Sequence, residues 1–267
     1  MSREIKAGKR SSRKKGIYIL PNLFTSASLF GGFYAIIASI QGRYEAAAVA
    51  IILAAICDGI DGRVARLTGT ASDFGREFDS LSDLVSFGVA PAVLAYLWAL
   101  KPFGRLGWLA AFMYAICGAL RLARFNVETT RMKSMFFKGL PIPMAAFFIA
   151  SLILFSYNFQ EFVEKREIII IIMIYALSFL MVSSLNYFSF KEINIKNRKP
   201  FNVLVTSILI LLIIAYKPKI LLFLIVSLYI ISGPVVSLYR RYRKIKAVRR
   251  HTVVRPEDNG SEASKNK

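Results

Sequence analysis

The stretch CDGIDGRVARLTGTASDFGREFDSLSDLVSFGVAP, from Cys57 to Pro91, places acidic residues between two apolar segments of the chain. It contains five of the six aspartates in the protein, which are Asp58, Asp61, Asp73, Asp79 and Asp83. A charged side chain inside a membrane span costs about 3 kcal/mol on insertion scales, so carboxylates in such a position are expected to serve a function.

The rest of the chain has the composition of a membrane protein. It has 267 residues, 55% of them hydrophobic, and a mean hydropathy of +0.50. Eight segments have the approximate length of a membrane span, and they are 21–40, 46–66, 81–100, 107–125, 141–157, 168–188, 201–216 and 220–239. We therefore expect an all-α, polytopic membrane bundle of about eight transmembrane helices.

The positive charges predict an orientation in the membrane. The net charge of +20 would suit a nucleic-acid-binding protein, but the basic residues gather at the two ends and in the gaps after the second, fourth and sixth spans. By the positive-inside bias, these gaps and both termini are cytoplasmic, as an even number of spans requires. We expect a multi-pass protein of the cell inner (plasma) membrane that contacts membrane lipid and no nucleic acid.

The aspartate spacing predicts a metal site. Asp58 and Asp61 are three residues apart, and Asp79 and Asp83 are four apart, so each pair lies on one face of a helix. A short break, 68–72, lets the two helices run antiparallel with the pairs facing each other. Four converging carboxylates need a compensating cation, and oxygen ligands favour Mg²⁺ or Mn²⁺. We interpret Asp73 instead as an ordinary loop charge that pairs with a nearby arginine.

The same residues form a signature at fixed spacing. Its eight defined positions are Asp58, Asp61, Gly62, Ala65, Arg66, Gly75, Asp79 and Asp83. The signature resembles the motif of the CDP-alcohol phosphotransferase family. The resemblance implies two divalent metals held by Asp58, Asp61 and Asp79, with Asp83 as a further metal neighbour and the general base. It also implies CDP binding by Asp61, Gly62, Ala65, Arg66 and Gly75.

Motifs further along are similar to those of the membrane-integral phosphatidylserine synthases within that family. They are Arg121-Leu-Ala-Arg-Phe-Asn-Val127, Phe137-Lys-Gly-Leu-Pro-Ile-Pro143 and Met181-Val-Ser-Ser184. This resemblance implies transfer of a phosphatidyl group from CDP-diacylglycerol to L-serine by a homodimer. Arg121, Arg124 and Asn126 are candidates for binding the acceptor or phosphate, because the serine carboxylate needs a cation. The alternative is that these arginines only mark a cytoplasmic helix end.

The resemblance covers about residues 21–191 and divides the chain. We expect a basic cytoplasmic segment at 1–20, a six-helix phosphotransferase core at 21–191, a transmembrane hairpin at 192–239 and a basic, polar cytoplasmic tail at 240–267. The stretch 21–25, at the start of the first span, could also reach the nucleotide, but we interpret it as a plain helix start.

Other functions stay open on the residues alone. Glycerol 3-phosphate or an inositol phosphate could replace serine as the acceptor. An ion-coupled transporter also uses intramembrane carboxylates, although more often at mid-bilayer. A membrane prenyltransferase would need a second aspartate-rich tract, which the chain lacks.

Overall fold

The computed structural model describes residues 2–69, 72–129, 136–157, 167–188 and 218–253, and most of them are helical. The α-helices are α1 (Ser2–Ile40), α2 (Tyr44–Thr68), α3 (Asp73–Asp83), α4 (Ala90–Ala95), α5 (Arg105–Thr129), α6 (Ile142–Ser156), α7 (Glu167–Val182) and α9 (Pro218–Val253). Two short strands, β1 (Phe136–Lys138) and β2 (Asn186–Phe188), pair antiparallel. The predicted all-helical bundle is confirmed, with this small ladder as an addition.

Five consecutive helical segments form one continuous rod from Asp73 to Phe103. In it, α3 leads into a π-helical segment, η1 (Leu84–Val89), then α4, a second π segment, η2 (Tyr96–Leu100), and a final 3₁₀ turn, η3 (Lys101–Phe103). The first π segment begins immediately after Asp83. A π turn disturbs the regular helical hydrogen bonds, and π turns are frequent near functional sites. Here the hydroxyl of Tyr114, on α5, donates a hydrogen bond to the Phe87 carbonyl at 3.1 Å.

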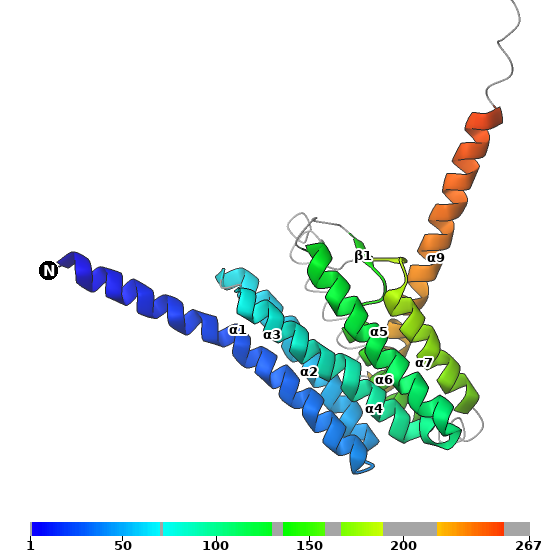
Figure 1. The fold of residues 1–267 in the computed structure, drawn as a ribbon, viewed down its shortest axis with the longest axis horizontal. Helices are drawn as coiled ribbons and strands as arrows, with labels where there is room; N and C mark the ends of the chain where they lie inside the picture. The colour runs from blue at the N-terminus through cyan, green and yellow to red at the C-terminus, as the bar shows by residue number, and fades with distance from the viewer. Residues whose placement is uncertain (1, 70–71, 130–135, 158–166, 189–217, 254–267) are drawn as a thin grey trace, which may run out of the picture.

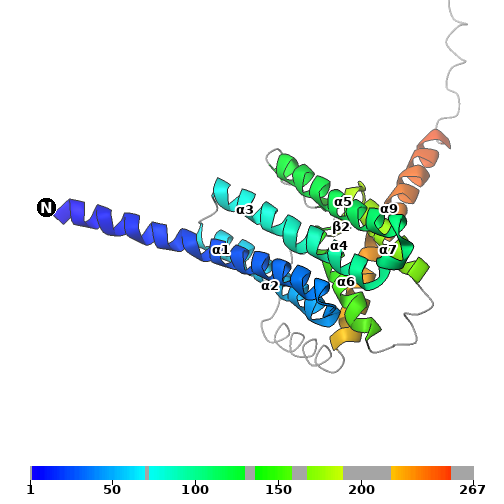
Figure 2. The ribbon, with the colours of Figure 1, turned by 60° about the horizontal axis from the view of Figure 1, so that its bottom comes forward.

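The helices pack as an antiparallel bundle (Figures 1 and 2). Only three residues, 41–43, join α1 to α2, and Gly104 alone joins the rod to α5, so each of these pairs must run antiparallel. Helix α1 contacts both α2 and the rod, α5 contacts the rod and α7, and α6 lies against α2 and α9. Figure 1 shows the N-terminal part of α1 extending beyond the bundle, on the side where α2 ends and α3 begins.

Small residues let α1 approach α2 and the rod closely. A Cβ atom on Gly32 would lie 2.5 Å from the Ser86 Cα atom, and one on Gly31 would lie 3.1 Å from the Ala54 Cβ atom. The Ser86 hydroxyl donates to the Ser28 carbonyl at 3.0 Å. Close approach of small residues and hydroxyl bonds between helices stabilise membrane bundles. The result is that α2 and α3, which carry the aspartates, are held at fixed positions against α1.

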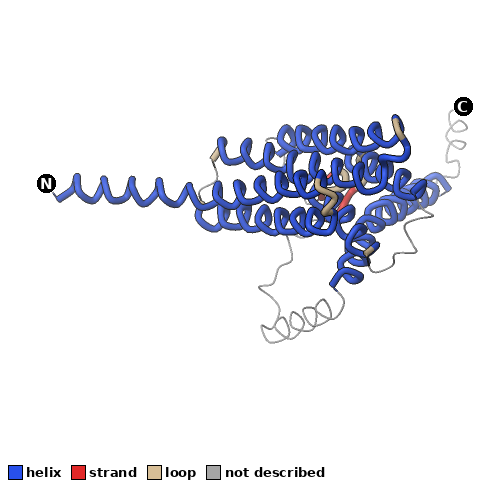
Figure 3. The backbone as a smooth tube through the Cα atoms, turned by 90° about the horizontal axis from the view of Figure 1, so that it is seen from below, coloured by secondary structure: helices blue, strands red, loops and turns tan. Residues whose placement is uncertain are grey.

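The β-ladder connects the ends of α5 and α7 with α9. Figure 3 shows the strands inside a surround of helices. Next to β1, Gly139 has a positive φ of 79°, and its amide donates to the Leu185 carbonyl at 2.8 Å. Tyr187 in β2 is fully buried, and its hydroxyl donates to the Ile230 carbonyl of α9 at 3.3 Å.

Four helical stretches are long and apolar enough to cross a membrane, among the residues described. They are 20–40, 73–103, 105–127 and 218–239, which match the first, third, fourth and eighth predicted spans. The fifth and sixth spans correspond to shorter apolar helices, Ile142–Ser156 and Ile168–Val182. The sixth ends before residue 188 because 186–188 form β2.

The remaining two predicted spans are of a different kind. The second span lies within α2, whose second half carries the charged residues of the signature. The seventh, 201–216, lies outside the described residues. The membrane bundle is therefore confirmed, while the total of eight spans stays a prediction.

Candidate active site

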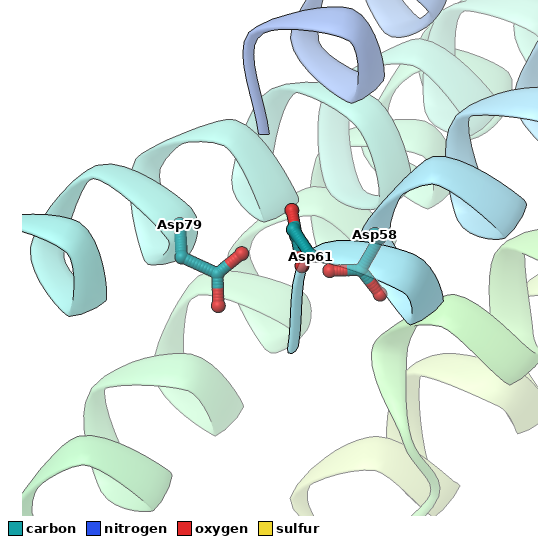
Figure 4. Close-up of side chains that lie close together, drawn as sticks. All are labelled: Asp58, Asp61 and Asp79. Carbon is teal, nitrogen blue, oxygen red and sulfur yellow. The ribbon is translucent and has the colours of Figure 1, made fainter. Parts of the chain in front are cut away.

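Three carboxylates converge between α2 and α3. Asp58 and Asp61 occupy successive turns of α2, and Asp79 faces them from α3 (Figure 4). One oxygen from each of the three lies within 4.8 Å of the other two. The predicted facing of the two helices is thereby realised, and the three side chains are close enough to share a metal ion.

Asp83 joins the same group. It lies one helical turn beyond Asp79, and its carboxyl group is within hydrogen-bonding reach of Asp58. One oxygen of Asp79 and one of Asp83, Oδ1 in each case, are buried with no hydrogen-bond partner among the described residues. Buried polar atoms are normally paired, so these two oxygens indicate a site built for a ligand.

Thr25 of α1 positions Asp61. The Thr25 hydroxyl donates to Oδ2 of Asp61 at 2.9 Å, and Asp61 is only 4% exposed. The Thr25 carbonyl in turn accepts a hydrogen bond from Ser82 of α3 at 3.1 Å. The sequence pattern did not predict this role, because residues 21–25 resemble a plain helix start. The available signal was Thr25, Ser26 and Ser28, three hydroxyl residues close together in the apolar part of α1.

The nearby arginines do not neutralise the four carboxylates. Arg76 pairs with Asp73, and both side chains are exposed, which agrees with the interpretation of Asp73 as an ordinary surface charge. Arg66 is exposed, and its Nε donates to the Gly62 carbonyl at 2.8 Å. The described residues show no ion pair to Asp58, Asp61, Asp79 or Asp83. A cluster of oxygen ligands without a protein counter-charge fits a hard divalent cation.

The predicted nucleotide-binding positions continue from this cluster along α2. Gly62 and Ala65 follow Asp58 and Asp61 at helical spacing and are not buried. A Cβ atom on Gly62 would meet nothing within 4 Å, so packing within the chain does not require a glycine there. Glycine lets a ligand approach the backbone closely. Gly75, by contrast, is confined, because a Cβ atom there would lie 3.1 Å from the Ser72 hydroxyl.

The three acceptor candidates on α5 have different surroundings. Arg121 is 8% exposed, and its Nε has no hydrogen-bond partner among the described residues. Its electrostatic neighbours are Asp83 and Tyr229 of α9. Arg124 donates to the Val182 carbonyl at the end of α7. Asn126 donates to the Ser80 hydroxyl at 3.0 Å. Of the three, Arg121 is the one that the structure brings to the carboxylates.

Comparison with known proteins shows that the chain matches one family and is similar to several relatives. The sequence model of a family described as CDP-alcohol phosphatidyltransferase matches residues 18–182. A CDP-diacylglycerol–serine O-phosphatidyltransferase of Helicobacter pylori is 37% identical over 217 residues, which cover 81% of this chain and 90% of the relative. The Bacillus subtilis protein of the same name is 37% identical over 173 residues, or 65% of this chain and 92% of the relative. An archaetidylserine synthase of Methanothermobacter thermautotrophicus is 42% identical over 170 residues, which cover 63% of this chain and 69% of the relative.

Proposed function

The chain belongs to the CDP-alcohol phosphatidyltransferase family, and from this membership we infer that it transfers the phosphatidyl group of CDP-diacylglycerol to L-serine. The products are phosphatidylserine and CMP. The observation that carries this inference is the carboxylate cluster of Asp58, Asp61, Asp79 and Asp83, set in a chain whose relatives are named for this transfer. The protein is thus an enzyme of phospholipid synthesis that works in a membrane.

The reaction is a substitution at phosphorus. The serine hydroxyl oxygen forms a bond to the lipid-side phosphorus, and the bond from that phosphorus to the oxygen of CMP breaks. Asp83 takes the proton of the attacking hydroxyl, as a carboxylate within reach can do. Its Oδ1 atom is buried and has no hydrogen-bond partner among the described residues, which supports this role.

The carboxylates prepare the site for the pyrophosphate. We assign Asp58, Asp61, Asp79 and Asp83 as ligands of two Mg²⁺ or Mn²⁺ ions. Bound there, the cations would neutralise the pyrophosphate and stabilise the departing CMP. The Thr25 hydroxyl keeps Asp61 oriented for that task. No ion pair to these four carboxylates occurs within the described residues, which supports the assignment.

The CDP group is proposed to lie along the exposed end of α2. Gly62 and Ala65 give it access to the backbone, Gly75 sits opposite in the first turn of α3, and the exposed Arg66 can contact a phosphate. Arg121 is proposed to hold the acceptor, with Arg124 and Asn126 further out along α5. The buried position of Arg121 supports giving it the main role.

An apolar cavity beside the carboxylates suits the lipid part of the substrate. Its volume is about 770 Å³, and it runs between α1 and α2 from Cys57, adjacent to Asp58, to Arg43. Side chains such as Phe30 and Leu53 line it. Acyl chains entering this cavity would leave the pyrophosphate at the carboxylate end. This arrangement favours a lipid-linked nucleotide over a soluble one.

The remaining predictions concern the setting of the enzyme. We propose that it lies in the cell inner (plasma) membrane with the active site and both termini in the cytoplasm, where serine and the nucleotide are found. We retain the division into segments 1–20, 21–191, 192–239 and 240–267, and the homodimer, as proposals.

The test is CMP release by the purified protein with CDP-diacylglycerol and a panel of acceptors. We expect release that depends on L-serine and on Mg²⁺ or Mn²⁺, with little release for ethanolamine, glycerol 3-phosphate or an inositol phosphate. Preference for glycerol 3-phosphate would reject serine but keep the phosphatidyl transfer. Absence of CMP release with every acceptor would reject the transfer itself.

A further inference from the structure

We propose that Tyr229 of α9 completes the acceptor pocket and selects L-serine, by donating a hydrogen bond to the serine carboxylate beside Arg121. This inference rests on the proposed function. It assigns acceptor recognition to a helix that lies outside residues 18–182, the part of the chain that the family model matches.

Arg121 gives the first reason to expect an anion at this place. Its side chain is more than nine-tenths buried, and its Nε lacks a hydrogen-bond partner in the part of the chain that the structure describes. A buried cationic group is unfavourable unless it is paired and hydrogen-bonded. Asp83 is an electrostatic neighbour, but the two do not form an ion pair within the described residues. An acceptor with a hydroxyl and a carboxylate would satisfy both.

Tyr229 is the second group that interacts electrostatically with Arg121. The course of α9 explains how a residue so late in the chain arrives there. At the start of α9, Lys219 forms an ion pair of 2.5 Å with Glu45, at the end of the bundle opposite the carboxylates. Tyr229 is ten residues further on, which is about 15 Å along a helix. Helix α9 therefore runs back toward the active site, packed against α6 and β2, and brings Tyr229 within electrostatic range of Arg121.

Tyr187 of β2 fixes the rotation of α9. Its ring centroid is 5.7 Å from that of Tyr229, and its hydroxyl bonds the Ile230 carbonyl. Gly233 makes room for the same ring, since a Cβ atom there would lie 2.3 Å from Tyr187 Cζ. A helix held at three successive points cannot turn freely. Tyr229 is therefore a positioned group, which is what recognition of a small acceptor requires.

The chemistry of serine matches the two side chains. A carboxylate accepts several hydrogen bonds, and a guanidinium and a phenol can both donate to it. With the carboxylate held by Arg121 and Tyr229, the serine hydroxyl can point to Asp83, the other neighbour of Arg121. Ethanolamine has no carboxylate to bind, so it loses both contacts. The family core then supplies the pyrophosphate chemistry, and α9 supplies discrimination between acceptors.

The experiment compares Tyr229→Phe with Tyr239→Phe, a matched control on an exposed part of the same helix. For Tyr229→Phe we expect the KM for L-serine to rise about 10-fold, the low end for losing a hydrogen bond to a charged group. The kcat and the KM for CDP-diacylglycerol should stay near those of the unaltered enzyme, and the preference for serine over ethanolamine should fall. Tyr239→Phe should match the unaltered enzyme in all of these.

A second variant tests the positioning role of Tyr187. Tyr187→Phe removes the hydroxyl that bonds Ile230 and should raise the KM for L-serine in the same direction, without changing the KM for the lipid. The proposal is overturned if Tyr229→Phe leaves the KM for L-serine unchanged, or alters the kinetics of both substrates equally, as loss of packing would. Failure of the proposed function looks different, because the unaltered enzyme would then show no serine-dependent CMP release.

Discussion

Asp73 and Asp79 lie six residues apart on one helix, yet their surroundings give them different roles. Asp73 is exposed and pairs with Arg76, which makes it a surface charge of small energetic effect. Asp79 is partly buried, has one oxygen with no hydrogen-bond partner among the described residues, and lies beside Asp58 and Asp61. We therefore expect the catalytic activity to depend on Asp79 and not on Asp73.

Replacing Asp79 with Asn should abolish most of the activity without unfolding the protein. The change keeps the shape of the side chain but removes a metal ligand, and we expect CMP release to fall at least about 100-fold, as for loss of a group that acts directly in catalysis. Without metal, the melting temperature should be equal or higher, because one of four repelling carboxylates is gone.

Asp73→Asn is the matched control for that change, and it should retain nearly full activity. An essential Asp73 together with a dispensable Asp79 would show that the ligand assignment is wrong.

Residue spacing was sufficient to predict the aspartate cluster but not its support. Asp58 and Asp61, then Asp79, face one another because a short break between two helices leaves few other arrangements. The Thr25 bond to Asp61 joins residues 36 positions apart, and the Arg121–Tyr229 neighbourhood joins residues still further apart. Such contacts depend on how each helix is rotated within the bundle. That rotation follows from packing, which a single sequence does not specify.

Helix α2 carries both the proposed metal ligands and the proposed nucleotide-binding residues, and its Gly62 has different surroundings from Gly32 of α1. Gly62 faces open space, whereas Gly32 of α1 lies against the Ser86 backbone. Glycine inside a helix costs up to about 1 kcal/mol relative to alanine. At Gly32 the close helix contact offsets this cost, but at Gly62 no described contact does. We therefore propose that glycine is needed at position 62 to leave room for the substrate.

Alanine at the two positions should therefore have opposite effects. Gly62→Ala should leave the melting temperature unchanged or raised, while the KM for CDP-diacylglycerol rises by about 10-fold through crowding of the nucleotide. Gly32→Ala should lower the melting temperature, because its Cβ atom would lie 2.5 Å from Ser86 Cα. Kinetics and thermal unfolding in the same detergent measure both. A fully active Gly62→Ala enzyme would remove the nucleotide from this face of α2.

Several features at the scale of elements could not be predicted from hydropathy. The two π segments in the rod and the β1–β2 ladder leave no mark in the apolar pattern, because they depend on contacts such as the Tyr114 bond to Phe87. The ladder also explains why α7 stops at Val182 rather than near residue 188.

The proposed active site lies at one end of the helical bundle. The last residues of α2 and the first of α3 lie at that end, and the α1–α2 turn lies at the other, since the helices alternate in direction (Figure 1). The basic residues that flank the active end predict that it faces the cytoplasm. This orientation gives the site direct access to soluble serine.

Cysteine labelling tests the orientation. In a chain with Cys57 and Cys117 replaced by serine, a cysteine at Gln41, in the exposed α1–α2 turn, should react with a membrane-impermeant reagent from outside the cell. A cysteine at Leu67, 88% exposed near the end of α2, should react only after the membrane is permeabilised. Labelling of Leu67→Cys from outside would place the active site on the wrong face.

Incorporation of labelled L-serine into lipid by the purified protein tests the phosphatidyl transfer itself. With CDP-diacylglycerol and Mg²⁺ or Mn²⁺, we expect one labelled phosphatidylserine for each CMP released, and a loss of activity of at least about 100-fold in Asp83→Asn. Serine-dependent CMP release without labelled lipid, or full activity of Asp83→Asn, would contradict this expectation.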